Sequence, residues 1–326
     1  MRRLLLSCCV WLVSSFANAA PFTLEIPVRC TIGQDCFIQN YVDQGKGDLH
    51  HDFRCRPLSY NGHTGTDIRT GIIDMSKKSP EVLASADGEV LRMRDGEEDR
   101  IITSDDPHDP KGCGNAVILG HAGGWETSYC HLRKDSIVVK PQQKVKAGDV
   151  LGQIGLSGQT EFPHVHLQVR NPQGIIVDPF NAQPIETGCS VRQEQLWSDK
   201  ARQHLNINDA GVLAVGAASQ VVAKNDVLMA RHSHTQFSTE APALVLWVLT
   251  YGLKKGDELF MILLAPNDET MVENRTKFTS FKAQSLDFIG KKKSKDAWAV
   301  GTYEGIVSAS RKGTTLFDRT FTFEVK

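Results

Sequence analysis

The sequence predicts an all-β protein built from two domains. From Pro21 to about Gln183, short apolar runs rich in β-branched and aromatic residues are separated by glycine-containing steps, which is typical of short strands and turns. No long stretch before Cys189 repeats its apolar residues with the 3.6-residue period of a helix. A second series of alternating runs follows a polar connector, and the roughly 300 residues beyond the N-terminal segment favour two domains over one.

Residues 1–19 are expected to be a secretory signal peptide. Two arginines precede an apolar run from Leu4 to Phe16, and the Ala-Asn-Ala tripeptide at 17–19 supplies a small-residue cleavage site. The mature chain is then expected to begin at Ala20 and to be exported. No later apolar run approaches the roughly 18 residues that a membrane span needs, so we expect no transmembrane segment.

The charge balance excludes one class of partner. Removal of Arg2 and Arg3 with the signal peptide lowers the formal charge from −1 to −3. Nucleic-acid-binding domains carry a strongly basic balance or a basic face. We therefore expect no nucleic-acid partner.

Six cysteines remain outside the signal peptide, and an even number in an exported chain indicates disulfides. Six cysteines permit about 15 pairings. We favour a pair that closes a short loop, a pair that flanks a hairpin, and a pair formed by the two cysteines that are left. These are Cys30 with Cys36, Cys113 with Cys130, and Cys55 with Cys189. A cysteine-ligated zinc site is the alternative, and the sequence lacks the CxxC pair that such a site commonly uses.

Residues 20–186 are expected to form the first domain, with a disulfide-tied extension at its N-terminus. The expected strands lie, in order, in EVLASADGEVLRM, GNAVILGH, WETSYCHL, DSIVVK, KVKAGDVLGQIG and FPHVHLQVR. The Asp87-Gly88 and Gly123-Gly124 steps supply hairpin turns between them. Residues 95–112 are polar and rich in aspartate and proline, which predicts a long surface loop.

Residues 187–207 are expected to be a linker that holds a short helix in RQEQLWSDKARQHL. Residues 208–326 are then expected to form a small immunoglobulin-like β-sandwich, with strands in PALVLWVLTYGL, DELFMILLAP, GTYEGIVSAS and TTLFDRTFTFEV. The last run alternates cleanly at Phe321, Phe323 and Val325. No catalytic cluster is evident in this second domain.

Two histidines in FPHVHLQVR suggest where the chemistry lies. His164 and His166 are two residues apart, so on a strand their side chains leave the same face and point into one place. A bare HxH is also compatible with a surface strand whose two imidazoles are solvated. The motif therefore needs partners elsewhere in the first domain.

Three further residues supply those partners. His63 and Asp67 lie in an HxGxD segment, and His131 ends a strand in YxHL. A catalytic zinc needs about three protein ligands from imidazole and carboxylate groups, plus an open position for water. His63, Asp67 and His166 would fill that number. His131 and His164 would remain as unligated imidazoles, which suit proton transfer near neutral pH.

In this combination the first domain resembles the lysostaphin-type, LytM-like zinc endopeptidases, which cut peptide bonds in bacterial cell-wall peptidoglycan. The resemblance runs from about Gly62 to Phe180. It rests on segments that occur in the right order, namely GHTGTDI, VLASADGEV, CGNAVILGH, ETSYCHL, VKAGDVLGQIGLSGQ, FPHVHLQVR and the closing DPF. It implies a glycine-rich catalytic domain of β-sheet or barrel-sandwich form. It also implies one zinc ion (Zn2+) per chain on His63, Asp67 and His166, with His131 and His164 as the catalytic histidines.

The implied reaction is metal-assisted hydrolysis of peptidoglycan stem peptides or cross-bridges, in the periplasm or outside a bacterium. Zinc would activate a water molecule, one imidazole would take its proton, and the other would stabilise the oxyanion or protonate the leaving amine. The C-terminal sandwich is then a candidate to bind the cell wall or a protein partner. We expect it to be dispensable for chemistry on a soluble peptide.

Some residues depart from the family pattern or extend it. Gln168 stands where the family often has an acidic residue, two positions after the final ligand. The segment before the HxGxD motif is either a lid, with Asn40, His50 or Asp52 reaching the site, or a disulfide-tied edge, and the second interpretation is favoured. Tyr129 is two residues from His131; we expect it to pack in the core in preference to donating to the oxyanion.

Two rival functions remain. Members of this family that have lost zinc ligands act as non-catalytic regulators or binders of other wall hydrolases, but here every ligand position is filled. Phosphocarrier domains of sugar transport also combine glycine-rich β structure with paired histidines. Export and six cysteines argue against that second rival.

Overall fold

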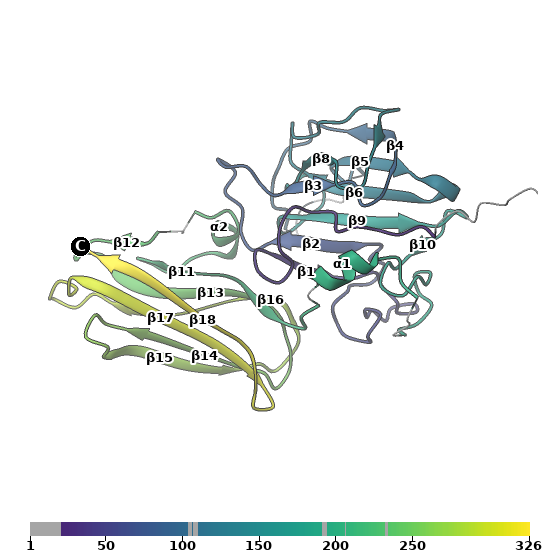
Figure 1. The fold of residues 1–326 in the computed structure, drawn as a ribbon. Coiled ribbons are helices and arrows are strands. Elements are labelled where there is room, and N and C mark those ends of the chain that lie inside the picture. Colours follow the sequence, from purple (N-terminus) through teal and green to yellow (C-terminus); the bar gives the residue numbers. More distant parts are fainter. Residues whose placement is uncertain (1–20, 104–105, 107–109, 191–193, 206, 232–233) are drawn as a thin grey trace, which may run out of the picture.

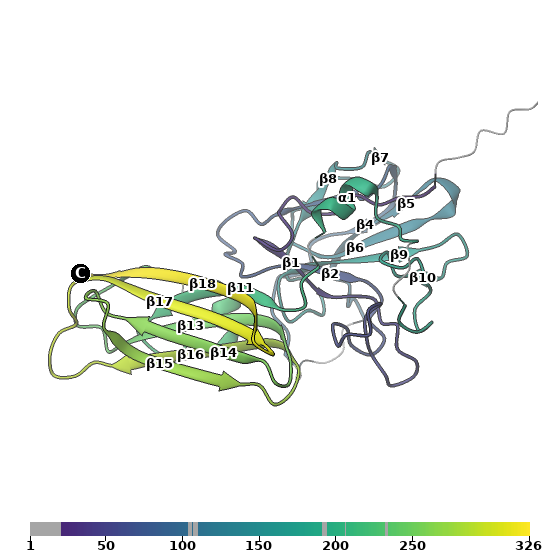
Figure 2. The same cartoon turned by 60° about the horizontal axis from the view of Figure 1, so that its bottom comes forward.

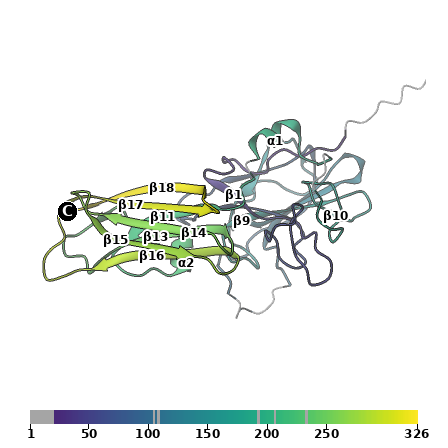
Figure 3. The ribbon, with the colours of Figure 1, turned by 90° about the horizontal axis from the view of Figure 1, so that it is seen from below.

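The computed structural model describes residues 21–103, 106, 110–190, 194–205, 207–231 and 234–326. The expected signal peptide, residues 1–19, lies outside this range. The described chain is almost entirely β and forms two bodies that lie side by side (Figures 1 and 3). The all-β prediction is therefore confirmed. In the described ranges, no helix has the length and apolar character needed to cross a membrane.

Over its described residues, the first body contains ten strands and one 3-10 turn. They are β1 (Cys36–Asn40), β2 (Thr66–Thr70), β3 (Glu81–Leu83), β4 (Gly88–Arg94), β5 (Asn115–Gly120), η1 (Ala122–Gly124), β6 (Glu126–Leu132), β7 (Lys144–Val145), β8 (Val150–Gln153), β9 (His164–Arg170) and β10 (Ile176–Val177). An antiparallel sheet has the order β1-β2-β9-β6-β5-β4-β7, with β10 paired to β9, and β3 and β8 form a separate two-stranded sheet. This topology places β2, β9 and β6, the strands with most of the predicted site residues, next to one another.

Alternation along β9 explains how one strand serves both the core and the site. Val165, Leu167 and Val169 are buried in the apolar core of the first body, together with residues of β3 and β8. Residues with the opposite parity leave the other face of the sheet. His164 and His166 therefore share a face that the core does not use.

One expected strand is wrong. In DSIVVK, residues 135–140, no strand forms. Asp135 adopts a left-handed conformation with φ 58°, and the backbone N–H groups of Asp135 and Ile137 donate to the Asp95 carboxylate, at 2.9 and 3.2 Å, in place of a neighbouring strand. The Val138 side chain is 66% exposed. Residues 95–112 contain no helix or strand where they are described, as expected for a loop.

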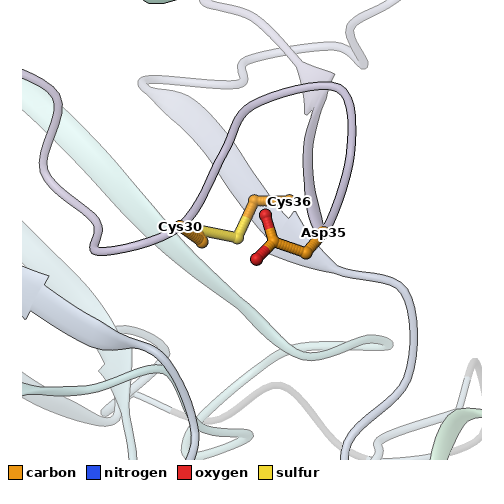
Figure 4. A group of neighbouring side chains, drawn as sticks. All are labelled: Cys30, Asp35 and Cys36. Carbon is orange, nitrogen blue, oxygen red and sulfur yellow. A yellow bond between two sulfur atoms is a disulfide. The ribbon is translucent and has the colours of Figure 1, made fainter.

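All three expected disulfides are present, joining Cys30 to Cys36, Cys55 to Cys189, and Cys113 to Cys130. The first closes a loop of six residues just before β1, and Figure 4 shows it beside Asp35. The second spans 134 residues and joins the N-terminal extension to the far end of the first body.

The expected linker is not a free connector over its described residues. It holds the expected short helix, α1 (Asp199–His204), which starts with Ser198 Oγ accepting a hydrogen bond from Ala201 N–H. Trp197 and Ala201 are buried in the core of the first body, and α1 lies against that body in Figure 2. This connector belongs to the packing of the first domain.

The second body is a two-sheet sandwich. Its elements are β11 (Gly211–Ala218), α2 (Lys224–Leu228), β12 (Gln236–Phe237), β13 (Ala243–Leu253), β14 (Glu258–Leu264), β15 (Thr270–Lys277), β16 (Lys282–Lys292), β17 (Gly301–Arg311) and β18 (Thr314–Val325). One sheet has the order β11-β13-β16 and the other β12-β18-β17-β14-β15, with β12 parallel to β18. Its assignment to the immunoglobulin type remains a prediction.

Candidate metal centre and its histidines

Strand register aligns the predicted ligands. Asp67 on β2 lies opposite His166 on β9, and on its other side Asn40 of β1 lies opposite Asp67 after a register shift between Ile38 and Asn40. The three side chains thus form one row across three neighbouring strands. All three residues are buried.

His63 reaches this row from the turn before β2. Its Nδ1 lies 2.7 Å from the carbonyl oxygen of Tyr41, which can only accept, so Nδ1 carries the proton and Nε2 has a free lone pair. Gly65 is the glycine of the HxGxD motif, and the position requires glycine because a Cβ there would lie 2.6 Å from His166 Nε2. A larger residue would displace the imidazole of His166.

Three potential ligand atoms converge. His63 Nε2 lies 3.1 Å from Asp67 Oδ1 and 3.1 Å from His166 Nδ1, and His166 Nδ1 lies 2.9 Å from Asp67 Oδ1. These atoms lie within 4.8 Å of one another and are suited to hold a metal ion. Imidazole nitrogen and carboxylate oxygen are ordinary zinc ligands.

A second group of potential ligands near the surface does not qualify. Cys30, Asp35 and Cys36 lie close together, but the two sulfurs are joined in a disulfide (Figure 4). Asp35 Oδ1 accepts a hydrogen bond from Thr31 N–H at 2.6 Å. Disulfide sulfurs cannot act as thiolate ligands, so this group is a closed loop.

Asp67 is held as an anion. Burial by itself would raise its pKa, but the neighbouring imidazoles of His63, His164 and His166 hold the pKa well below its usual range. Asn40 Nδ2 adds a hydrogen bond of 2.9 Å to the second oxygen, Asp67 Oδ2. Oδ1 is thus directed toward the histidines, while Oδ2 is fixed by Asn40.

A β-bulge turns His131 toward the same place. Between β5 and β6 the register passes from Val117 opposite Tyr129 to Asn115 opposite Leu132, so β6 has one extra residue there. His131 has φ 62°, a conformation that is uncommon for residues other than glycine. Bulges often redirect a side chain beside a functional site.

The same bulge separates His131 from Tyr129. Tyr129 is fully buried in the core, and its hydroxyl accepts hydrogen bonds from Ser85 N–H at 2.7 Å and from Thr127 Oγ1 at 3.1 Å. The prediction that Tyr129 packs in the core is confirmed.

His131 and His164 lie next to each other, with ring centroids 4.6 Å apart. His131 Nδ1 lies 2.8 Å from Ser157 C=O, and His164 Nδ1 lies 2.9 Å from Phe162 C=O. Since a carbonyl only accepts, each ring carries its proton on Nδ1, which leaves Nε2 as a proton acceptor. His164 Nε2 lies 3.4 Å from Asp67 Oδ1, beside the candidate ligands.

Burial lowers the pKa of His131 well below its usual range, and the neighbouring imidazoles of His164 and His166 lower it further. Burial also lowers the pKa of His166, against the opposing effect of Asp67. His131 is consequently neutral near pH 7. A neutral imidazole with a fixed Nδ1–H can accept a proton at Nε2.

The structure thus brings together all five predicted site residues. Of the three residues considered in the N-terminal extension, Asn40 contacts the centre, while His50 is exposed and Asp52 pairs with Arg56 at 2.7 Å. The extension supplies β1 as the edge strand of the sheet, as the favoured interpretation expects, and through Asn40 it also reaches the centre, as the alternative expects.

Sequence reasoning missed the groups that orient the imidazoles. Thr64 Oγ1 lies 3.4 Å from His166 Nε2, and the Gln168 amide, with its nitrogen facing Thr64, lies 3.0 Å from that hydroxyl. Gln168 therefore contacts the candidate ligand His166 only indirectly, through the Thr64 hydroxyl. The carbonyls of Ser157 and Phe162 left no signal in the sequence, because any residue type supplies a carbonyl.

Tyr60, which is 53% exposed, covers the His63 ring, and the two ring centroids are 4.4 Å apart.

Comparison with known proteins agrees with this geometry. Residues 61–179 match the family model described as Peptidase family M23. The cell division protein DipM of Caulobacter vibrioides is 33% identical over 130 residues, which is 40% of this chain and 19% of that protein. The DD-carboxypeptidase/endopeptidase Mpg of Neisseria meningitidis is 33% identical over 119 residues, which is 36% of this chain and 21% of that protein.

A third relative, the murein hydrolase activator NlpD of Escherichia coli, is 28% identical over 126 residues, which is 39% of this chain and 27% of that protein. The matched region is thus about a fifth to a quarter of the length of each relative. The match covers β2 to β10 and all five residues of the candidate centre. Residues 61–179 are a domain of peptidase family M23.

Proposed function

We propose that the protein is an exported zinc endopeptidase that hydrolyses peptide cross-links of bacterial peptidoglycan. One observation carries this proposal. The ligand atoms of His63, Asp67 and His166 converge beside two further imidazoles whose Nε2 atoms are free to accept protons. A binding protein needs no such pair of proton acceptors next to a metal centre.

The donor set fits zinc. Two imidazole nitrogens and one carboxylate oxygen are the ligands of many catalytic zinc sites, which keep a further position open. Tyr41 C=O fixes His63, and Asn40 fixes Asp67, so the ligands are oriented by the fold. Zinc, when bound, polarises a carbonyl and makes a water molecule more acidic.

His131 and His164 would move the proton. The Nδ1–H of each ring is committed to a backbone carbonyl, so neither ring can donate from Nε2 until it has accepted a proton there. During hydrolysis one Nε2 takes a proton from water as the new C–O bond forms. The same proton is then available to the leaving amine as the C–N bond breaks, which balances the reaction. Asp67 lies close enough to His164 to stabilise the intervening imidazolium.

The substrate class and location rest on the relatives and on the sequence. The name of Mpg describes carboxypeptidase and endopeptidase activity, and NlpD is named as an activator of a hydrolase of murein, the bacterial wall polymer. Export agrees with the expected signal peptide and with three disulfides in the folded chain. The name of NlpD also suggests the alternative, a non-catalytic activator or binder of wall hydrolases.

Digestion of purified sacculi separates the two functions. Zinc-loaded protein should release fragments with new peptide termini, identified by mass spectrometry, while chelator-treated protein should release none and His164→Ala should release far less in the same time. If the zinc-loaded protein left sacculi intact but stimulated a separate wall hydrolase, the endopeptidase assignment would be wrong and the activator function would replace it.

A further inference from the structure

A second row of side chains runs beside the metal row on the same face of the sheet. Arg69 on β2 lies opposite His164 on β9 and, on its other side, opposite Phe37 on β1. Arg69 has the same parity as Asp67, so both leave the same face of β2. His164 is therefore the end of a row that reaches the edge strand β1.

Arg69 is fully buried and lies against the segment that precedes His164. Its guanidinium lies over the Phe162 ring, with Cζ 4.4 Å from the ring centroid. It donates hydrogen bonds to Thr70 C=O at 2.8 Å, to Gly71 C=O at 3.2 Å and to Gln39 Oε1. None of these partners is a carboxylate, so the three hydrogen-bond acceptors and the face of the Phe162 ring offset the desolvation of the buried cation.

Phe162 connects Arg69 to His164. Its ring centroid lies 4.6 Å from that of His164, and its carbonyl accepts the Nδ1–H of His164 at 2.9 Å. Thr160 Oγ1 donates to the same carbonyl at 2.8 Å. The position of Phe162 thus sets both the orientation of His164 and the nitrogen that carries its proton.

The C-terminal sandwich packs against Phe162 and covers this side of the stack. β13 is buried on both faces: Leu244, Leu246 and Val248 pack inside the sandwich, while alternate residues lie on the opposite face. That opposite face forms one apolar cluster with two buried residues of the first domain, Phe37 and Phe162. The buried members that the second body contributes to this cluster are Leu213, Ala218, Val222, Val227, Leu228, Trp247, Leu249 and Tyr251. The rings of Phe37 and Tyr251 are 5.8 Å apart.

The backbones of the two domains also touch directly. Gly71, just after β2, lies so close to β11 that a Cβ there would be 1.8 Å from Leu213 C=O. Ile73 N–H donates to Leu228 C=O, at the end of α2, at 2.8 Å. Figures 1 and 3 show the sandwich lying against the β1 and β2 side of the first domain. The contact reaches within two residues of Arg69.

We propose that the C-terminal sandwich is a structural part of the hydrolytic site, because it seals the Arg69–Phe162 stack that holds His164 in its working orientation. Arg69 and Phe162 are thus positioning residues. This inference rests on the proposed function and replaces the expectation that the sandwich is dispensable for chemistry. It also accounts for the continuous apolar sequence of β13, since a strand buried on both faces shows no alternation.

Gly71→Ala in the full-length protein is the primary test. The φ of Gly71 lies outside the left-handed region, so alanine is tolerated by the local backbone and strains only the contact with Leu213. We expect one zinc per chain to remain and kcat on a soluble peptide to fall about 10- to 100-fold with little change in KM, since small misplacements of catalytic groups cost up to about that factor. Leu263→Ala is the matched control, because Leu263 is fully buried inside the sandwich, away from the interface.

A second readout does not depend on hydrolysis. The Nδ1–H proton of His164, assigned in NMR spectra by its loss in His164→Ala, should be protected from exchange in the native protein and in Leu263→Ala. It should exchange rapidly in Gly71→Ala. If Gly71→Ala fails to fold, Tyr251→Ala tests the same interface, and Tyr251→Phe should restore both readouts.

The outcomes separate the two proposals. Native protein that hydrolyses nothing would refute the proposed function, while the NMR comparison would still decide the inference. Wild-type kcat and wild-type Nδ1–H protection in Gly71→Ala or Tyr251→Ala would overturn the inference. Equal losses in Leu263→Ala and Gly71→Ala would overturn it too, because general destabilisation of the sandwich would then explain both.

Discussion

Asn40 offers a sharp test of how the fold prepares the metal centre. Its Nδ2 donates to Asp67 Oδ2 at 2.9 Å, and both residues are buried. Asn40→Ala removes this donor and leaves one oxygen of a buried carboxylate without it. His63 and His166, the two imidazole ligands, are not altered.

The expected loss follows from the chemistry of this hydrogen bond. A hydrogen bond to a charged group contributes about 1.5 to 3 kcal/mol, and about 1.4 kcal/mol corresponds to a factor of ten in affinity. Asn40→Ala should therefore weaken zinc binding about 10- to 100-fold, in the range found when an outer partner of a metal ligand is removed. The free carboxylate oxygen would also admit alternative ligand orientations.

Competition with a chromophoric chelator measures this affinity directly. His50→Ala is the matched control, because His50 belongs to the same N-terminal extension but is exposed. Asn40→Asp should bind zinc differently from wild type as well, since it places a second carboxylate against Asp67. An affinity for Asn40→Ala within twofold of wild type would refute the view that Asn40 orients the ligand.

Two further predictions concern stability. Burial raises the pKa of Asp178 to about 7, and its Oδ2 has no hydrogen-bond partner among the described residues. Because the folded state then holds this proton more tightly than the unfolded state, the free energy of unfolding should fall by about 1.4 kcal/mol per pH unit between about pH 4 and 7. Asp178→Asn should flatten that dependence in urea titrations at several pH values; an unchanged slope would exclude Asp178 as its source. Replacing both Cys113 and Cys130 by serine removes the disulfide that closes a loop of 17 residues beside the bulge. The free energy of unfolding should fall by about 3 kcal/mol, seen as a lower Tm. An unchanged Tm would contradict that expectation.

Local chemistry made much of the centre predictable. Side-chain alternation alone placed His164 and His166 on one face, and the strand structure follows that pattern. Loop length identified the Cys30–Cys36 pair. The HxGxD motif was informative because its glycine leaves room for His166.

The rest depended on features that alternation does not encode. The extra residue in β6 separates Tyr129 from His131, two residues that strand alternation alone would place on one face. Trp197 lies in a polar stretch that resembles a linker, yet its side chain fills the core of the first domain. The apolar run of β13 was assigned to a sandwich, and its second buried face became evident only from the packing of the two domains.

Zinc content measured beside hydrolysis in three single variants tests the central claim most directly. His166→Ala should lose zinc and activity together. His131→Ala and His164→Ala should keep one zinc per chain and lose about 10²- to 10⁴-fold in rate, the usual cost of removing a positioned acid or base. Full activity in both His131→Ala and His164→Ala would contradict the hydrolytic mechanism, even for a protein that binds zinc. Loss of zinc from His164→Ala with retention in His166→Ala would reverse the roles assigned to the two histidines of β9.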